Sequence, residues 1–205
     1  MAVQLNEIST PPSPTADLWR DGLPMLADGF VMLREIELAD AAGLTARLAR
    51  PKVSQFSEPS PSTVEGFRRY IRWTRLERVR GRHASFAIIP TDLAEPVGVI
   101  QLWRDASMPG VFQWGAVIDD RYWRRKIFTA SARLLQRFAF SQAHAERLDA
   151  YVCLGNEAAH ATFRRLGATR ASTLHRLKVR GEGRLHLRWT IHRPGRCATG
   201  CHDER

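Results

Sequence analysis

The chain has few cysteines, almost no lysine and no long apolar run. Its three cysteines, at positions 153, 197 and 201, are too few for the disulfide framework of a small secreted domain. No apolar run approaches the length that crosses a bilayer, and Met1–Asp17 lacks the charged and apolar segments of a secretory signal. These absences predict a cytoplasmic protein that does not contact a membrane.

Three residues of the C-terminal tail, Cys197, Cys201 and His202, belong to types that bind metals. A structural zinc site needs four ligands, and this segment offers no clear fourth. We therefore expect no metal, and we interpret residues 193–205 as a flexible tail.

Basic residues outnumber acidic ones by 31 to 21, which gives a net charge of +10. Only Lys52, Lys126 and Lys178 are lysines, so the excess is nearly all arginine. The planar guanidinium group binds phosphates and carboxylates, which suits nucleotide, nucleic-acid or acidic protein partners. The arginines are scattered along the sequence, however. Most of them are interpreted as solubility charge, and a nucleic-acid partner is not favoured.

A length of 205 residues with 44% hydrophobic residues suits one domain with a real core. The start of the chain is rich in proline and has little apolar periodicity, which predicts an N-terminal extension over residues 1–27. The domain itself is expected to span residues 28–192.

Periodicity and turn residues predict an alternation of strands and helices in this domain. Strands are expected at residues 30–34, 84–89, 97–103, 112–118, 148–154, 174–179 and 184–192. Helices are expected at residues 41–48, 63–80, 127–140 and 156–165. The strand–helix–strand crossover in the second half predicts a parallel pair within a mixed α/β sheet, with helices on its faces.

Three segments of this pattern resemble a known family. They are Val31–Arg34 with the following Leu38–Ala41, the block Trp114–Trp123 that runs into a helix ending near Phe140, and Asn156–Ala168. Their order and spacing are similar to those of the GNAT superfamily of N-acetyltransferases, over roughly residues 28–192. Within it, the ribosomal-protein N-acetyltransferases are the most similar subgroup.

This resemblance implies a mostly antiparallel sheet that splays open at its central strands. It implies acetyl-CoA as co-substrate, no metal, and direct transfer of the acetyl group to a primary amine of a protein N-terminus or of a small molecule. It also implies that Tyr122–Thr129 is the loop that binds the pyrophosphate of CoA. Such a loop has a physical basis, because a helix N-terminus offers several backbone N–H groups and a favourable dipole to a phosphate.

The loop departs from the family pattern Gln/Arg-x-x-Gly-x-Gly/Ala, because Trp123–Phe128 contains no glycine. Glycine permits close approach and unusual dihedral angles, which Arg124 and Lys126 restrict. Two interpretations stay open. Arg124, Arg125 and Lys126 bind phosphate through charge and compensate for the missing glycines, or the chain is a catalytically weakened module that senses CoA or binds RNA or the ribosome.

The resemblance also assigns individual residues. Those implied to contact the cofactor are Val117, Ile118, Trp123, Arg124, Arg125, Lys126, Ile127, Phe128, Thr129, Asn156 and Phe163. The backbone N–H groups around Val117 and Ile118 are implied to polarise the thioester carbonyl. Asn156 is implied to contact the pantetheine arm, although a helix N-cap explains it equally well.

The catalytic candidates are Gln113 and Asn156. Gln113 occupies the region where many relatives carry a carboxylate base, and an amide cannot take up a proton at neutral pH. Glu35 and His83 remain as weaker candidates for the base. Phe163 occupies the position of the tyrosine that protonates the thiolate in many relatives, which excludes a tyrosine acid there.

The acceptor is expected to bind between residues 52–80 and the closing hairpin. An aromatic and proline-rich wall is expected from Phe56, Pro59, Pro61, Phe67, Tyr70 and Trp73. Trp103 and Trp114 either line a cleft or pack in the core. The identity of the amine, the acyl chain and the oligomeric state, a homodimer included, are left open.

Overall fold

The computed structural model describes residues 19, 21–179 and 181–195, and the tail residues Cys197, Cys201 and His202 lie outside them. Within the described residues the chain forms one eight-stranded sheet in the order β1-β2-β3-β4-β5-β6-β8-β7. The strands are β1 (Leu26–Ala27), β2 (Val31–Glu35), β3 (His83–Pro90), β4 (Gly98–Arg104), β5 (Val111–Ile118), β6 (Arg147–Cys153), β7 (Thr169–Val179) and β8 (Glu182–His192). Neighbouring strands run antiparallel except β5 and β6, which form the predicted parallel pair.

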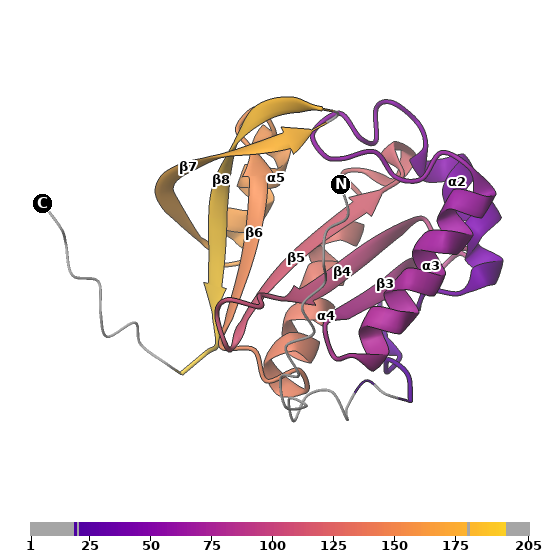
Figure 1. Cartoon of the computed structure of the whole chain (residues 1–205), viewed down its shortest axis with the longest axis horizontal. Coiled ribbons are helices and arrows are strands. Elements are labelled where there is room, and N and C mark those ends of the chain that lie inside the picture. The colour runs from indigo at the N-terminus through magenta and orange to yellow at the C-terminus, as the bar shows by residue number, and fades with distance from the viewer. Residues whose placement is uncertain (1–18, 20, 180, 196–205) are drawn as a thin grey trace, which may run out of the picture.

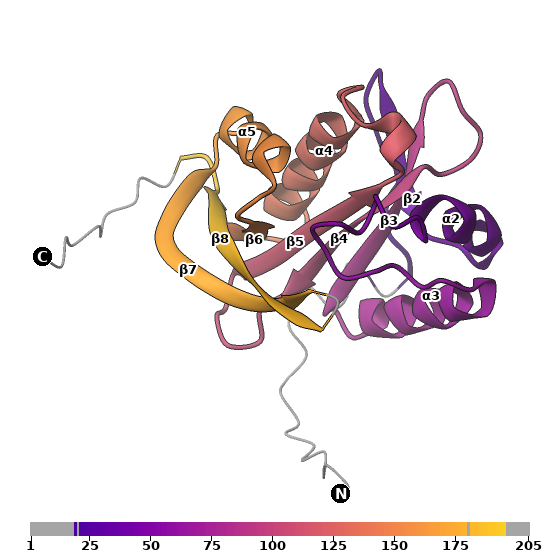
Figure 2. The same cartoon turned by 90° about the horizontal axis from the view of Figure 1, so that it is seen from above.

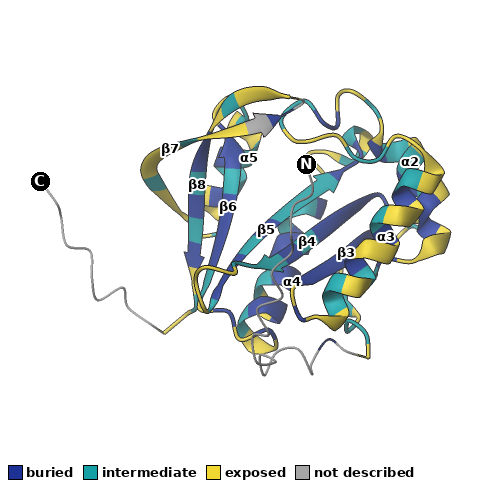
Figure 3. Ribbon diagram, in the orientation of Figure 1, coloured by how far each residue is buried: buried dark blue, intermediate teal, exposed yellow. Residues whose placement is uncertain are grey.

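Within the part of the chain that the structure describes, four α-helices cover the two faces of this sheet. They are α2 (Ala41–Leu48), α3 (Val64–Val79), α4 (Ile127–Ser141) and α5 (Glu157–Arg165). Helices α4 and α5 lie on one face and α2 and α3 on the other (Figure 2). Strand β3 and most of β4 are buried between them, while most of β7 and the outer sides of α2 and α3 are exposed (Figure 3). This confirms the predicted mixed α/β fold.

The helices begin and end where local chemistry favours it. The Thr63 hydroxyl accepts a hydrogen bond from the Gly66 N–H (3.1 Å) and caps α3, with Glu65 in the first turn. At the start of η1 (Leu38–Asp40), the short 3-10 helix that leads into α2, the Asp40 carboxylate accepts from the Glu37 N–H (2.8 Å). These caps explain why the predicted boundaries agree with the structure to within a few residues.

The central parallel pair is short, and this creates an opening in the sheet. Strands β5 and β6 are paired only over residues 111–113 and 147–149, and beyond them the two strands diverge (Figure 1). Strand β5 stays paired to β4 along its whole length. One edge of β5 is therefore left without a partner strand from residue 114 onward.

Two features at the ends of the fold were not predicted from the sequence. Strand β1 extends the sheet before residue 28, and β7 begins at Thr169 rather than at residue 174. The pairing of β7 with β8 is irregular between Arg170 and Leu174, which disrupts the alternation that a strand prediction depends on.

Trp19 lies within the segment expected to be an irregular extension, yet its side chain is only 1% exposed. Its ring stacks on Phe138 of α4 at 6.0 Å and contacts Phe112 of β5 at 6.2 Å. The Arg78 guanidinium also donates a hydrogen bond to the Trp19 carbonyl. A single aromatic residue gives no periodicity, so the sequence could not predict this anchor.

None of the described helices is long and apolar enough to cross a bilayer.

The position of Trp19 predicts a large effect on stability. The substitution Trp19→Ala is expected to lower the free energy of unfolding by about 3–5 kcal/mol, because removal of the indole ring leaves a cavity inside the main core. Urea denaturation measures this, with Met25→Ala as a control. Met25 is 67% exposed, so its replacement should change stability by no more than about 0.5 kcal/mol. A similarly small effect of Trp19→Ala would contradict the anchoring role.

Candidate active site

The free edge of β5 is the first component of the site. The Val111 carbonyl accepts from the Asp105 N–H (3.0 Å), and the Asp119 N–H donates to the Val97 carbonyl (2.9 Å). Both bonds reach the β4 side of β5. Because backbone groups alternate along a strand, Val117 also faces β4, while the peptide groups of Ala116 and Ile118 face the opening.

Two further observations agree with this alternation. A Cβ added to Gly98 of β4 would lie 2.4 Å from the Val117 carbonyl oxygen, so that carbonyl points toward β4. The Trp123 indole N–H donates to the Ile118 carbonyl (2.9 Å) from the other side. Of the two strand residues predicted to polarise a thioester, the geometry favours Ile118 for a backbone contact.

The loop before α4 is the second component. Arg124 and Lys126 both have φ = 63°, in the left-handed region that glycine adopts at no steric cost. For other residues this conformation costs about 1–2 kcal/mol. The loop therefore holds a backbone shape that glycines commonly provide, although neither residue is a glycine.

The N-terminus of α4 offers donors to an anion. The first bond within the helix runs from the Ala130 N–H to the Lys126 carbonyl (3.0 Å), so the N–H groups of residues 127–129 precede any acceptor in the helix. No acidic residue lies in the first turn. Donors and helix dipole together favour a negatively charged group at Ile127, Phe128 and Thr129.

Cations from distant parts of the chain surround this loop. Arg50 and Lys52, which follow α2, pair with Asp120 at 3.1 and 3.4 Å. Arg121 pairs with the buried Asp119 at 2.5 Å. Burial raises the pKa of Asp119, but the bonds from Arg121 outweigh this effect, so the net pKa lies below its ordinary value.

The three loop cations are differently placed. Arg124, Arg125 and Lys126 are exposed, and none forms an ion pair with a residue that the structure describes. Arg125 lies over the Tyr122 ring, with 5.4 Å between guanidinium carbon and ring centroid. Their positive charge is thus available to a ligand.

An aromatic cluster lies behind the loop. The ring centroids of Trp114 and Phe163 are 5.1 Å apart, and Phe128 lies 6.1 Å from Trp114 and 6.3 Å from Phe163. Trp114 is 2% and Phe163 4% exposed. Of the two alternatives for Trp114, core packing is the one the structure shows.

The predicted catalytic side chains have structural partners. The Asn156 side-chain oxygen accepts from the Ala159 N–H (3.2 Å) and caps α5, as one of its two interpretations required. The Gln113 amide donates to Asp105 (3.2 Å). Gln113 lies opposite Asp149 of β6, at the point where the two strands begin to diverge.

The two weaker candidates for a base lie away from the opening. Glu35 accepts from the Arg78 guanidinium (2.7 Å) and from the Leu23 N–H (3.2 Å), which gives it a structural role. His83 lies on β3, two strands from β5. Burial lowers its pKa to about 4, so it is neutral at pH 7.

The expected acceptor wall divides into core and surface residues. Phe67 is buried, and the Tyr70 hydroxyl lies 3.1 Å from the Ser85 hydroxyl. Trp73 is 48% exposed and lies beside His83. Phe56 packs near Gly155, where an added Cβ would lie 3.7 Å from its ring. Pro61 packs beside Gly66 of α3, where an added Cβ would lie 3.4 Å from the Pro61 side chain.

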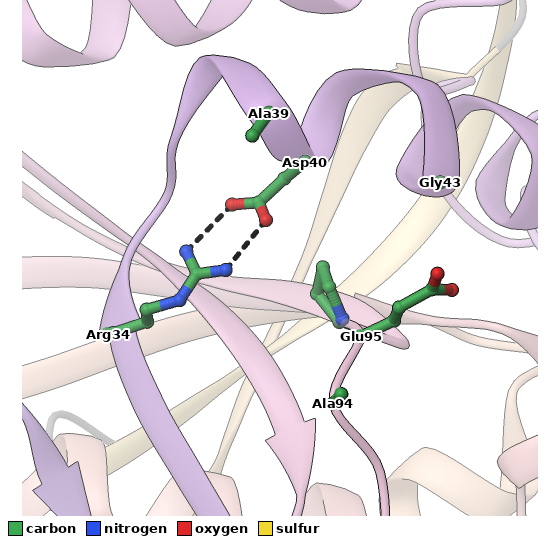
Figure 4. Close-up of a pocket in the computed structure, with 7 residues that line it drawn as sticks. Arg34, Ala39, Asp40, Gly43, Ala94 and Glu95 are labelled. Atoms are coloured by element: carbon green, nitrogen blue, oxygen red, sulfur yellow. Dashed lines mark hydrogen bonds and ion pairs between the residues drawn. The ribbon is translucent and has the colours of Figure 1, made fainter.

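A small cavity of about 140 Å³ lies elsewhere, between η1 (Leu38–Asp40), α2 and the segment before β4. Arg34 and Asp40 face each other there and form two hydrogen bonds of 2.8 and 2.7 Å (Figure 4). Glu95 pairs with Arg47 at 2.9 Å. The charged side chains that line this cavity are already paired with other protein groups, so the cavity is a poor site for a ligand.

The site thus combines an open strand edge with a cationic helix N-terminus, and a comparison with known families identifies the domain. The model for the acetyltransferase (GNAT) domain matches residues 31–169. The chain belongs to the GNAT family. This makes it an acyl-CoA N-acetyltransferase by family, as its sequence predicted.

Solved GNAT structures share the fold at low sequence identity. RimJ of Mycobacterium smegmatis in complex with CoA-disulfide has a TM-score of 0.75 at 20% identity, over 85% of this chain and 88% of that one. RimL, a ribosomal L7/L12 alpha-N-protein acetyltransferase, in complex with coenzyme A has a TM-score of 0.73 at 15% identity, over 82% and 98%. No curated protein sequence matches the chain.

Sequence reasoning missed the cations that this GNAT domain brings to the loop from α2 and the segment after it. Arg47, Arg50 and Lys52 precede the loop by about 70 residues, and no local pattern links them to it. The ion pairs that these cations form with Asp119 and Asp120 exist only in the folded chain.

The strained loop predicts an unusual response to glycine. Lys126→Gly is expected to raise the free energy of unfolding by about 0.5–1 kcal/mol, because relief of the left-handed strain exceeds the entropy gained by the unfolded chain. Arg125 has no positive φ and serves as the matched control. Arg125→Gly should lower stability by about 0.4–1 kcal/mol. If thermal denaturation showed an equal loss of stability in both variants, the backbone at Lys126 would not be strained.

The lowered pKa of His83 predicts a dependence of stability on pH. The unfolded histidine titrates near 6.5 and the folded one near 4, so the unfolded state binds more protons in between. Stability is full above pH 6.5 and falls by about 3 kcal/mol toward pH 4. His83→Gln should flatten this part of the profile in urea denaturation at a series of pH values. An unchanged slope would show that His83 is not buried in its neutral form.

Proposed function

We propose that the protein transfers an acetyl group from acetyl-CoA to a primary amine, with a protein N-terminus as the favoured acceptor. The observation that carries the proposal is the unpartnered edge of β5 next to the cationic N-terminus of α4. The description of RimL as an alpha-N-protein acetyltransferase supports a protein acceptor.

The residues around the loop fit the phosphates of CoA. The N–H groups at the start of α4 and the side chains of Arg124, Arg125 and Lys126 would hold them. Left-handed backbone at two positions keeps the loop concave without glycine. Trp123 ties the loop to β5 through the Ile118 carbonyl, which fixes the loop relative to the opening.

Acetyl-CoA supplies the acetyl group as a thioester. The part of this chain is to bind and polarise it: the peptide groups of Ala116 and Ile118, which face the opening, are suited to donate hydrogen bonds to a carbonyl oxygen. Phe163 and Gln113 neither give nor accept a proton. Asn156 positions the start of α5 through its cap rather than through a proton transfer.

A second function is favoured by those same two residues. Because Phe163 and Gln113 lack titratable groups, the site suits a module that binds CoA and transfers acetyl groups slowly or not at all. Release of free thiol from acetyl-CoA in the presence of an amine distinguishes the two functions. Turnover supports the transferase, and tight binding without turnover supports the sensor.

Binding of CoA tests the role of the loop cations. Replacing two of them in Arg124→Gln/Lys126→Gln removes charge but keeps side-chain length. We expect CoA to bind about 10–100-fold more weakly in calorimetric titration, with a smaller dependence on salt.

The matched control is Arg133→Gln/Arg137→Gln. These arginines are exposed on the same helix but beyond its first turn, so the change in net charge is identical. The control should bind CoA as the unchanged protein does. Absence of CoA binding to the unchanged protein would overturn the proposed function, and equal loss in both variants would overturn the specific role of the loop.

A further inference from the structure

A groove of about 420 Å³ lies on the α3 face of the sheet, opposite the face that carries the loop and α4. Helix α3 contributes one wall and strands β3 and β4 form the floor. The groove is lined by Trp73, Glu77, Arg82, His83, Gln101, Trp103 and Arg104.

Three rings form a row in this groove. Trp73 meets His83 edge-on with ring centroids 5.0 Å apart, and His83 stacks on Trp103 at 6.1 Å with an angle of 10° between the planes. Trp73 is 48% exposed, so part of its ring is accessible to a ligand. A flat, apolar group is the natural complement of such a surface.

Trp103 connects the groove to β5. A Cβ added to Gly115 would lie 3.6 Å from the Trp103 ring, so this ring extends from β4 over the glycine of β5. Gly115 directly precedes Ala116, whose peptide group faces the opening. The ring that lines the groove therefore reaches β5 next to the proposed transfer site.

His83 supplies the polar feature of the groove. Its side chain is 6% exposed, and its Nε2 atom has no hydrogen-bond partner among the described residues. An unpaired buried ring nitrogen costs free energy unless a ligand satisfies it. A phenolic hydroxyl both donates and accepts, so it suits either tautomer of the neutral imidazole.

The charges of the groove favour an anion beside the ring. Arg82 is exposed and forms no ion pair with a described residue, whereas the guanidinium of Arg104 lies over the Phe112 ring at 5.0 Å, in the core on the α4 face. Glu77 is the opposing charge, but it pairs with Arg80 at 2.7 Å. Arg82 is therefore the charge that the groove offers to a ligand.

We propose that this groove binds the segment that follows the acetylated amine, with a tyrosine ring on Trp73 and His83 and an adjacent acidic residue at Arg82. His83 lies two strands from β5, or about 10 Å at the usual strand spacing. An extended peptide advances about 3.3–3.6 Å per residue, so the Cα atom of the third residue lies about 7 Å from that of the first, and the length of a tyrosine side chain takes its ring to the groove. The inference rests on the proposed function, because it takes the amine to lie at the opening of β5.

Two peptide amides test this, Ser-Ala-Tyr-Glu-Ala and Ser-Ala-Ala-Gln-Ala. Equilibrium binding to the full chain is followed by tryptophan fluorescence in the presence of CoA, and acetylation is measured separately with acetyl-CoA. We expect the tyrosine peptide to bind at least tenfold more tightly and to react with at least tenfold higher kcat/KM.

The variant Trp73→Ala tests whether the preference for the tyrosine peptide arises in the groove. Trp73→Ala should reduce the tenfold difference to less than twofold, because it removes the exposed ring. Leu76→Ala is the matched control, since Leu76 is 50% exposed on the same helix and outside the groove. It should keep the full preference. Circular dichroism checks that both variants stay folded.

The outcomes separate the two levels of the proposal. Equal binding of both peptides, or a preference that survives Trp73→Ala, overturns the inference about the groove even if both peptides are acetylated. A binding preference that Trp73→Ala abolishes, without acetylation of either peptide, supports the groove and counts against the proposed function.

Discussion

The divergence of β5 from β6 is the constraint on which the rest of the site depends. Only residues 111–113 pair with residues 147–149, and the two halves of the sheet separate beyond them. An unpaired strand edge normally costs free energy when it is buried, unless another partner satisfies its peptide groups. Here the edge opens next to a helix N-terminus, so one region offers hydrogen-bond donors to a chain-like ligand and to its phosphates.

The loop that follows β5 keeps left-handed backbone at two positions without glycine. Arg124 and Lys126 hold left-handed conformations that disfavour their own side chains. These two residues also place exposed cations beside the N–H groups of residues 127–129 at the start of α4. The strain is local and small, whereas charge-assisted hydrogen bonds to a phosphate are among the stronger polar interactions in proteins. A sequence without glycine therefore remains compatible with an anion-binding loop.

The two faces of the sheet carry different chemistry. The face covered by α4 and α5 has the loop cations and a dry aromatic cluster around Trp114 and Phe163. The face covered by α3 has a groove with exposed Trp73 and an unpaired nitrogen of His83. The open edge of β5 lies between them, which suits a reaction whose two substrates arrive from opposite sides of one sheet.

Much of the fold follows from local signals. Caps such as Thr63, strong apolar periodicity in α4 and turn residues between strands determine the elements, and their order determines the crossover that makes β5 and β6 parallel. Local signals failed for Trp19 and for the start of β7. A lone tryptophan has no period, and the irregular pairing after Arg170 hides the alternation of the strand.

The sequence by itself determined the family, the elements and the position of the proposed phosphate-binding loop, because each depends on residues that are close along the chain. Only the tertiary structure decided which side chains reach that loop and which do not. It brought Arg50 and Lys52 to Asp120 across about 70 residues, placed Trp114 in the core and Trp103 on a groove, and turned Ile118 rather than Val117 toward the opening. Long-range packing and strand register set these outcomes, and neither leaves a local pattern in the sequence.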